Sequence, residues 1–97
     1  MGYIYKICND INNKVYVGQT TRTIEERFSE HCHSALKGSN FLIHKAMREY
    51  GINNFFVVEI EKCNDELLDD KEKYYINKYD SYYNGYNSTP GGRGIIS

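Results

Sequence analysis

The amino-acid sequence predicts a small α/β (α+β) domain, in which a mostly antiparallel sheet of about three strands is flanked by about three helices. Two observations favour this class. Two short runs of aromatic and β-branched residues flank a turn-forming cluster near the N-terminus, which is typical of a β-hairpin. Three later segments carry apolar residues at helical spacing, and one more β-rich run lies between them. The expected order of elements is therefore β-β-α-α-β-α.

The hairpin is expected from residues 3–7 and 14–18, with the Asn- and Asp-rich residues 9–13 between them. Asn and Asp favour turns because their side chains bond nearby backbone groups and they tolerate left-handed dihedral angles. Side chains alternate between the two faces of a strand, so a loop of even length would put Tyr5 and Tyr16 on the same face.

In that register Gly18 would lie near Tyr3 and, having no side chain, would leave room for a ligand at the backbone. A purely structural role for the tyrosines stays open at this point, because tyrosine is a good strand former.

The composition is that of a globular chain with a single core. The 97 residues are 40% hydrophobic and 26% charged, and no apolar run reaches the length of a membrane span. No signal peptide opens the sequence, and Cys8, Cys32 and Cys63 form an odd, widely spaced set. We therefore expect reduced thiols and an intracellular protein that is not secreted. We also expect no contact with a membrane.

The charge argues against a strongly nucleic-acid-binding chain. The net charge is −1 and the sequence pI is about 6.3, whereas proteins that bind nucleic acid through phosphate neutralisation are usually basic. A catalytic module can bind weakly where a local basic patch or another domain supplies affinity.

A first helix is expected from about Thr23 to Lys37. Thr23 and Glu26 have the spacing of a capping box, and Arg27 and His31, one turn apart, lie at the margin of the apolar face. As a pair, these two residues need no function. The apolar positions are Ile24, Phe28, Cys32, Ala35 and Leu36.

The run His31-Cys32-His33 suggests a metal site. Consecutive residues on a helix point in different directions, so they cannot close around one zinc ion. This interpretation is rejected.

A second helix is expected after Ser39 and Asn40, which can cap it, and Gly51 is placed to end it. We expect His44 to lie in solvent, and Lys45 and Arg48 to be candidate phosphate contacts. The apolar positions are Leu42, Ile43, Ala46, Met47 and Tyr50.

Residues 55–61 are expected to form a strand that pairs with the hairpin as a central or edge strand. A third helix, capped near Asn64, is expected over 65–79, with Glu72 inside its apolar stripe. A carboxylate on a buried face must be paired or bound to a metal. A buried salt bridge to Arg27 is the structural alternative.

The last informative block is Asn84-Gly85, a strong tight-turn signal, which delivers Asn87 just beyond it. A Gly-rich segment, 90–97, follows.

Taken in order, these features resemble the GIY-YIG nuclease family. Residues 3–5 (Tyr-Ile-Tyr) and 16–18 (Tyr-Val-Gly) resemble its paired motif, with Tyr3 in place of the first glycine and Val17 in place of isoleucine. The resemblance covers essentially the whole chain, with residues 1–89 as the nuclease domain and 90–97 as a flexible tail or the start of a linker. The matching residues are Tyr5, Tyr16, Gly18, Arg27, His31, Glu72 and Asn87.

The resemblance implies an endonuclease that hydrolyses phosphodiester bonds in double-stranded DNA. Glu72 would bind Mg²⁺, with Mn²⁺ as a substitute, and Arg27 would stabilise charge on the phosphate. Tyr5 would act as general base or position the attacking water, Tyr16 would orient that water or a phosphate oxygen, and His31 would relay the proton.

Asn87 would hold this geometry as a structural or active-site asparagine. Gly18, Lys45 and Arg48 are the further candidates for substrate binding.

Among family members, the sequence is most similar to the catalytic domains of homing and phage or viral endonucleases. This implies a C-terminal DNA-binding domain beyond residue 97 and a location in the cytoplasm of a bacterial or virus- or phage-infected cell. A stand-alone, restriction-type or repair-type nuclease is an alternative. A further alternative is a non-catalytic nucleic-acid-binding module that stacks bases on its ten tyrosines, although such a module has no need of Glu72 on a buried face.

Overall fold

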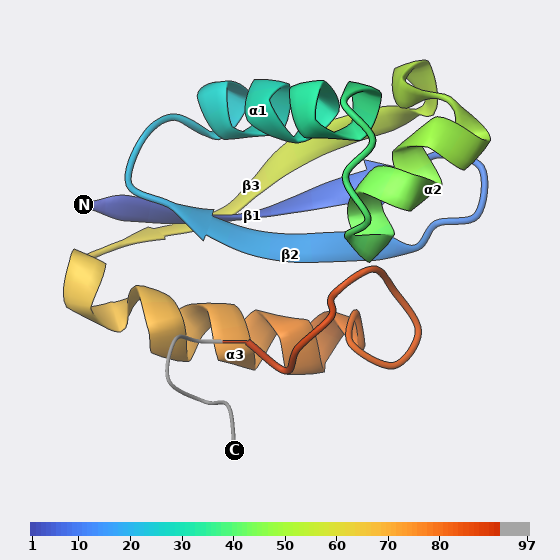
Figure 1. The fold of residues 1–97 in the computed structure, drawn as a ribbon. Helices are drawn as coiled ribbons and strands as arrows, with labels where there is room; N and C mark the ends of the chain where they lie inside the picture. The colour runs from blue at the N-terminus through green and yellow to red at the C-terminus, as the bar shows by residue number, and fades with distance from the viewer. Residues whose placement is uncertain (92–97) are drawn as a thin grey trace.

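A three-stranded antiparallel sheet lies between two layers of helix in the computed structural model, which describes residues 1–91 (Figure 1). The expected α+β class and the order β-β-α-α-β-α are confirmed. The predicted tail over 90–97 lies, from residue 92 onward, outside the described residues. The elements are β1 (Gly2–Asn9), β2 (Val15–Thr20), α1 (Ile24–Leu36), α2 (Leu42–Tyr50), β3 (Phe55–Cys63) and α3 (Leu68–Tyr79), with short 3₁₀ turns η1 (Ile52–Asn54) and η2 (Asp65–Leu67).

In the hairpin, Tyr5 and Tyr16 lie on the same face of the sheet, as expected, but the pairing of the two strands is shifted by two residues. Tyr5 pairs with Gly18, and Ile7 with Tyr16. A direct pairing of Tyr5 with Tyr16 needs a four-residue turn over residues 9–12, whereas the turn covers residues 10–13, inside the pair formed by Asn9 and Lys14. Tyr5 and Tyr16 therefore lie diagonally on one face, as predicted, whereas the expectation that Gly18 lies near Tyr3 is wrong.

The third strand, β3, is an edge strand, and the sheet order is β2-β1-β3 with β1 in the centre. A bulge interrupts its pairing, since Ile4 faces Glu61 and Tyr5 faces Glu59. The extra residue, Ile60, bends β3 next to Tyr5.

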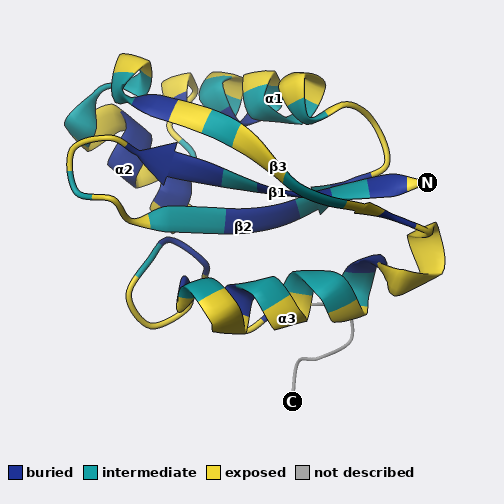
Figure 2. Cartoon of the chain, turned by 180° about the vertical axis from the view of Figure 1, so that it is seen from behind, coloured by how far each residue is buried: buried dark blue, intermediate teal, exposed yellow. Residues whose placement is uncertain are grey.

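Each face of the sheet has its own core. Tyr5 and Ile7 pack against residues of α1 and α2 on one face. Ile4 and Val17 pack against Leu68 and other residues of α3 on the opposite face. Burial is concentrated along the central strand β1 (Figure 2), because only this strand is covered by neighbours on both edges and both faces.

The helix ends agree with the sequence in part. Thr23 and Glu26 form the predicted capping box, and Gly51 ends α2 with a φ of 93°. The first residue before α2 is Phe41, which makes no side-chain cap, so capping by Ser39 or Asn40 is wrong. The third helix starts at Leu68 instead of residue 65, because residues 65–67 form a separate 3₁₀ turn without a side-chain cap from Asn64.

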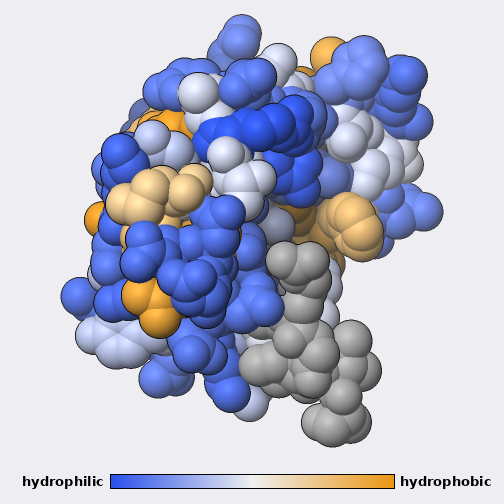
Figure 3. All heavy atoms as spheres, turned by 90° about the vertical axis from the view of Figure 1, so that its left-hand side faces the viewer, coloured by the Kyte–Doolittle hydropathy of each residue, from blue (hydrophilic) through white to orange (hydrophobic). Residues whose placement is uncertain are grey.

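Among residues 1–91, no helix has the length and apolar character needed to cross a bilayer. The face at the N-terminal end of the sheet is largely hydrophilic, with apolar atoms in small separate patches (Figure 3).

Candidate active site

Most of the predicted catalytic residues gather at the outer edge of β2, where α1 comes from one face of the sheet and α3 from the other. Tyr5 is fully buried on the neighbouring strand β1. A cavity of about 250 Å³ is lined there by Tyr16, Arg27, His31, Glu72 and Asn87, among others. An adjoining open cleft of about 440 Å³ shares Tyr16, Arg27 and Glu72. The structure thus brings together residues that lie up to 71 positions apart in the sequence, from Tyr16 to Asn87.

Gly18 makes room for Tyr5. A Cβ atom at position 18 would lie 2.5 Å from the Tyr5 hydroxyl and 2.9 Å from the Tyr16 ring. The space that the sequence suggested for a ligand is therefore filled by the ring of Tyr5. This ring is fully buried, and its centroid lies 6.4 Å from that of Tyr16.

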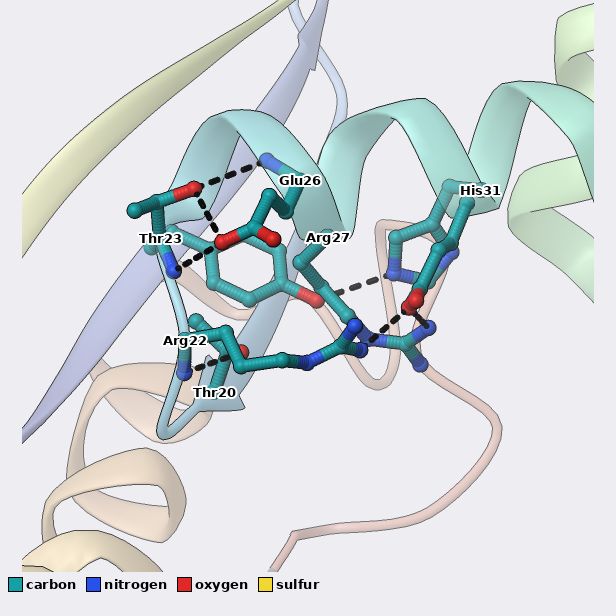
Figure 4. A network of polar contacts seen from close by, with 8 residues as sticks. Thr20, Arg22, Thr23, Glu26, Arg27 and His31 are labelled. Carbon is teal, nitrogen blue, oxygen red and sulfur yellow. Dashed lines mark hydrogen bonds and ion pairs between the residues drawn. The ribbon is translucent and has the colours of Figure 1, made fainter.

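Arg27 is half-buried on α1 and forms an ion pair with Glu30, 3.0 Å from Nη1 to Oε1. The same carboxylate oxygen accepts a second contact at 2.7 Å from Arg22. Figure 4 shows Arg22 and Arg27 converging beside α1, with His31 next to them. Hydrogen bonds from Arg22 and then Arg27 lower the pKa of Glu30 to about 2.

Glu72 projects from α3 toward the same cleft and is half-buried, less than its place in an apolar stripe suggested. Its carboxylate accepts a hydrogen bond from Gln19 Nε2 at 3.1 Å. The same amide donates to Asp69 at 2.8 Å, so Gln19 of β2 links two carboxylates on consecutive turns of α3. No motif or periodic pattern had singled out Gln19.

The donor set suits a cation that keeps most of its water. Among residues 1–91, no group of three or more His, Cys, Asp or Glu side chains could enclose a metal ion. Mg²⁺ is commonly held by one or two carboxylates together with waters and substrate phosphates. Glu72, at the wall of an open cleft, fits this mode of binding.

His31 is buried and in contact with Tyr5. The distance from Tyr5 Oη to His31 Nε2 is 2.9 Å. Burial lowers the pKa of His31 to about 3, with the positive charge of Arg27 as the second cause. Burial also raises the pKa of Tyr5 well above its ordinary value, with the neighbouring Tyr16 as the second cause. Both groups are therefore neutral at physiological pH.

His44 is the residue that the sequence placed wrongly. It is only 4% exposed, and its Nε2 lies 2.8 Å from Nδ1 of His31. The buried face of α2 is rotated relative to the predicted stripe, since Leu42 is 45% exposed while His44 faces α1. The spacing of apolar residues cannot reveal this rotation, because it predicts that Leu42 is buried and that a polar residue such as His44 is not.

Asn87 completes the outer edge of β2. Its Oδ1 accepts a hydrogen bond from the Val17 amide at 2.8 Å, and its Nδ2 donates to the Val17 carbonyl at 2.9 Å. The preceding residue, Tyr86, donates its amide to the Val15 carbonyl. Asn87 thus makes the hydrogen bonds that a residue of a neighbouring strand would make with the outer edge of β2.

Two of the predicted phosphate contacts lie elsewhere. Arg48 donates a 2.8 Å hydrogen bond to the carbonyl of Ala35, at the end of α1. Lys45 lines a separate depression together with Glu49 and Gly85. The structure does not bring either residue to the cleft of Arg27.

Comparisons with known proteins agree with this arrangement. A family model described as the GIY-YIG catalytic domain matches residues 1–87. The solved catalytic domain of homing endonuclease I-TevI superposes with a TM-score of 0.81 and 30% sequence identity, covering 92% of this chain and 99% of that one.

Sequence relatives include longer proteins of viruses and phages. The uncharacterized protein 019R of Invertebrate iridescent virus 6 is 50% identical over 62 residues, which are 64% of this chain and 22% of that protein. Intron-associated endonuclease 1 of Enterobacteria phage T4 is 32% identical over 94 residues, 87% of this chain and 35% of that protein. The chain therefore spans between about a fifth and two fifths of the length of the curated relatives it matches.

Proposed function

Because this chain belongs to the GIY-YIG catalytic domain family, and is a nuclease domain like those of homing endonucleases, we propose that it hydrolyses phosphodiester bonds in double-stranded DNA with the help of a divalent cation. The observation that carries the proposal is the open cleft whose walls combine a guanidinium, a phenol and a carboxylate: Arg27, Tyr16 and Glu72. These groups recognise a phosphate, orient a nucleophile and attract a cation, respectively.

Arg27 binds the scissile phosphate. Its side chain is partly exposed and lines the cleft, so a phosphate can reach it without unfolding the helix. Its planar donors stabilise the negative charge that builds up on the phosphate oxygens during attack.

Tyr16, which lines the cleft, orients the attacking water, and Tyr5 takes the proton of this water. Because Tyr5 is fully buried, this step requires the side chains in front of its hydroxyl to move when DNA binds. Burial keeps Tyr5 protonated, so its own proton must leave as the proton of the water arrives. His31 Nε2 is positioned 2.9 Å away to accept it. In this scheme Gly18 contributes by leaving the space that the Tyr5 hydroxyl and ring occupy.

Glu72 holds the cation, and Gln19 orients its carboxylate by a hydrogen bond. When bound, Mg²⁺ or Mn²⁺ supplies positive charge that stabilises the phosphate and the leaving oxygen. The position of Asp69 next to Gln19 adds negative potential on the same side of the cleft.

We further propose that the chain is the catalytic module of a homing endonuclease and acts inside the cell. A net charge of −1 is low for a protein that binds DNA alone, and the longer relatives are consistent with a DNA-binding domain beyond residue 97. A stand-alone nuclease of restriction or repair type is the second candidate. It would have to bind its target through this domain alone.

The test is cleavage of a supercoiled plasmid and of an end-labelled duplex by the purified chain. We expect cleavage with Mg²⁺ or Mn²⁺, none with EDTA, and a large loss for Glu72→Gln. Glu49→Gln, a matched loss of one carboxylate from the exposed face of α2, is the control. DNA binding without cleavage by the parental protein in either metal would favour the non-catalytic alternative.

A further inference from the structure

A continuous chain of hydrogen bonds runs from the active-site phenol to the loop between α1 and α2. Tyr5 Oη lies 2.9 Å from His31 Nε2, and His31 Nδ1 lies 2.8 Å from His44 Nε2. His44 Nδ1 lies 2.6 Å from the hydroxyl of Ser39. Tyr5, His31 and His44 are buried, whereas Ser39 is partly exposed.

All the hydrogen bonds in this series must point the same way, from Tyr5 to Ser39 or from Ser39 to Tyr5. A neutral imidazole has one N–H donor and one acceptor nitrogen. Two neutral rings that are hydrogen-bonded to each other, with a hydroxyl at each end, must therefore both carry the proton on Nδ1 or both carry it on Nε2. In one arrangement every donor points from Tyr5 toward Ser39, and in the other every donor points from Ser39 toward Tyr5.

The surroundings keep both rings neutral. Burial lowers the pKa of His44 as well as that of His31. The charged groups that act on the two rings are Arg27 and Glu30 of α1 and Arg48 of α2. Two arginines against one carboxylate disfavour a positive imidazolium.

We propose, on the basis of the nuclease function above, that His44 and Ser39 form the exit of a proton relay from Tyr5 to solvent. As the oxygen of the water bonds to phosphorus, the P–O bond to the leaving oxygen breaks, and the leaving oxygen takes a proton from solvent. The proton of the attacking water goes to Tyr5 Oη, and the phenol proton goes to His31 Nε2. His31 passes its Nδ1 proton to His44 Nε2.

His44 then passes its Nδ1 proton to Ser39, whose own hydroxyl proton goes to solvent. One proton enters and one leaves, and both rings exchange one tautomer for the other. Transfer in the reverse direction after product release restores the starting tautomers.

The relay solves an electrostatic problem of the buried site. If His31 alone accepted the phenol proton, it would become a buried cation close to Arg27, and such a charge is costly without a partner. With His44 taking the Nδ1 proton at the same time, each buried group stays neutral. His44 acts through His31 and is thus a positioning and relay residue, not one that touches the substrate.

His44→Gln separates relay from packing. The amide can still accept from His31 and donate to Ser39, so the hydrogen bonds survive, but an amide does not shuttle protons. General acid–base steps contribute about 10²–10⁴-fold to rate, and we expect single-turnover cleavage to fall by roughly tenfold to hundredfold with an unchanged melting temperature. His33→Gln, an exposed histidine of α1, should cleave at the parental rate.

His44→Ala provides the second readout. His44 lines the cavity of about 250 Å³ beside the site, so added imidazole can reach the space that its ring vacates. We expect imidazole to restore cleavage in His44→Ala and to leave His44→Gln unchanged. Parental cleavage by His44→Gln, or no rescue of His44→Ala by imidazole, would overturn the relay.

A readout without DNA keeps the two proposals apart. ¹⁵N NMR of histidine-labelled parental protein should show His31 and His44 neutral at pH 7.5, protonated on the same kind of nitrogen. Opposite tautomers, or a positively charged ring at that pH, would contradict the relay even if the protein cuts DNA. Failure of the parental protein to cut DNA in either metal would instead refute the nuclease proposal, and with it the relay as a step in cleavage.

Discussion

The side-chain amide of Asn87 makes both hydrogen bonds to Val17 that a neighbouring strand would make, at 2.8 and 2.9 Å. Val17 lies between Tyr16 and Gly18, so Asn87 holds the strand segment on which the phenol of Tyr16 is mounted. These two bonds fix the backbone of β2 at Val17, in line with the structural role expected of Asn87.

Asn87→Ala removes both of these bonds. A buried polar group left without a partner costs about 1–3 kcal/mol. The substitution leaves the amide and the carbonyl of Val17 without partners, so we expect the free energy of unfolding to fall by roughly 2–4 kcal/mol in total. Urea denaturation measures this change. Asn77→Ala, an exposed position on α3, is the control, and an equal loss there would show that the effect is not specific to Val17.

Arg27→Ala and Tyr5→Phe distinguish catalysis from folding. The ion pair of Arg27 with Glu30 is partly exposed, so its loss should cost no more than about 1 kcal/mol. Loss of one donor to transition-state charge is typically worth about 3–4 kcal/mol, or roughly a hundredfold or more in rate. We therefore expect Arg27→Ala to fold and to cleave at least a hundredfold more slowly in single-turnover assays.

Tyr5→Phe keeps the ring over Gly18 but removes the hydroxyl that contacts His31. We expect this protein to melt within a few degrees of the parent and to lose cleavage. A Tyr5→Phe protein that cuts at the parental rate would end the role of Tyr5 as proton acceptor. An Arg27→Ala protein that melts far below the parent would point instead to a structural arginine.

Glu30→Gln tests the carboxylate that bridges Arg22 and Arg27. In the parental protein this carboxylate occupies the two guanidiniums, and its lowered pKa of about 2 keeps it ionised at any working pH. We expect Glu30→Gln to bind duplex DNA more tightly and to show a steeper dependence of affinity on salt, because two more cations become available to phosphates.

Fluorescence anisotropy titrations at several salt concentrations measure this change. Glu49→Gln changes the net charge by the same amount on the face of α2 and serves as the control. Equal gains in both variants would show that overall charge, and not the bridge at Arg22 and Arg27, limits binding.

The buried histidines predict a loss of stability in mild acid. The pKa of His31 is about 3 in the folded protein against an ordinary value of 6.5. Between these values the unfolded chain holds a proton that the folded chain does not, so the free energy of unfolding falls as the pH falls. One such group contributes a slope of about 1.4 kcal/mol per pH unit.

Urea titrations between pH 7 and 5 should show this slope in the parent and a shallower one in His31→Gln. His33→Gln, from the exposed side of α1, should keep the parental slope. If His31→Gln and the parent respond alike to pH, folding does not lower the pKa of His31, and burial does not hold this ring in the neutral form.

The sequence predicted the fold because its local signals agree with one another. The capping box at Thr23, the positive φ at Gly51 and the even-length turn of the hairpin all depend on neighbouring residues, so they can be recognised without a structure. The class and order of elements followed from them. The register of the hairpin did not, since several Asn residues offer equivalent turn positions.

The site was predicted less completely, because its missing parts depend on tertiary packing. Gln19 reaches Glu72 only once α3 has docked on β2. The burial of His44 depends on how α2 crosses α1, and the space at Gly18 is filled by a side chain from the facing strand. No periodic pattern records these contacts. The positions of Lys45 and Arg48 away from the cleft follow from the same helix orientation.

The bond between Asn87 and Val17 joins positions separated by 70 residues. During synthesis, Tyr5, Tyr16 and Arg27 leave the ribosome long before the residue that fixes the β2 edge. A nascent chain therefore cannot hold a finished site until nearly the whole domain has emerged. Chains that end before Asn87 are therefore expected to lack the finished nuclease site even where Tyr5, Tyr16 and Arg27 are all present.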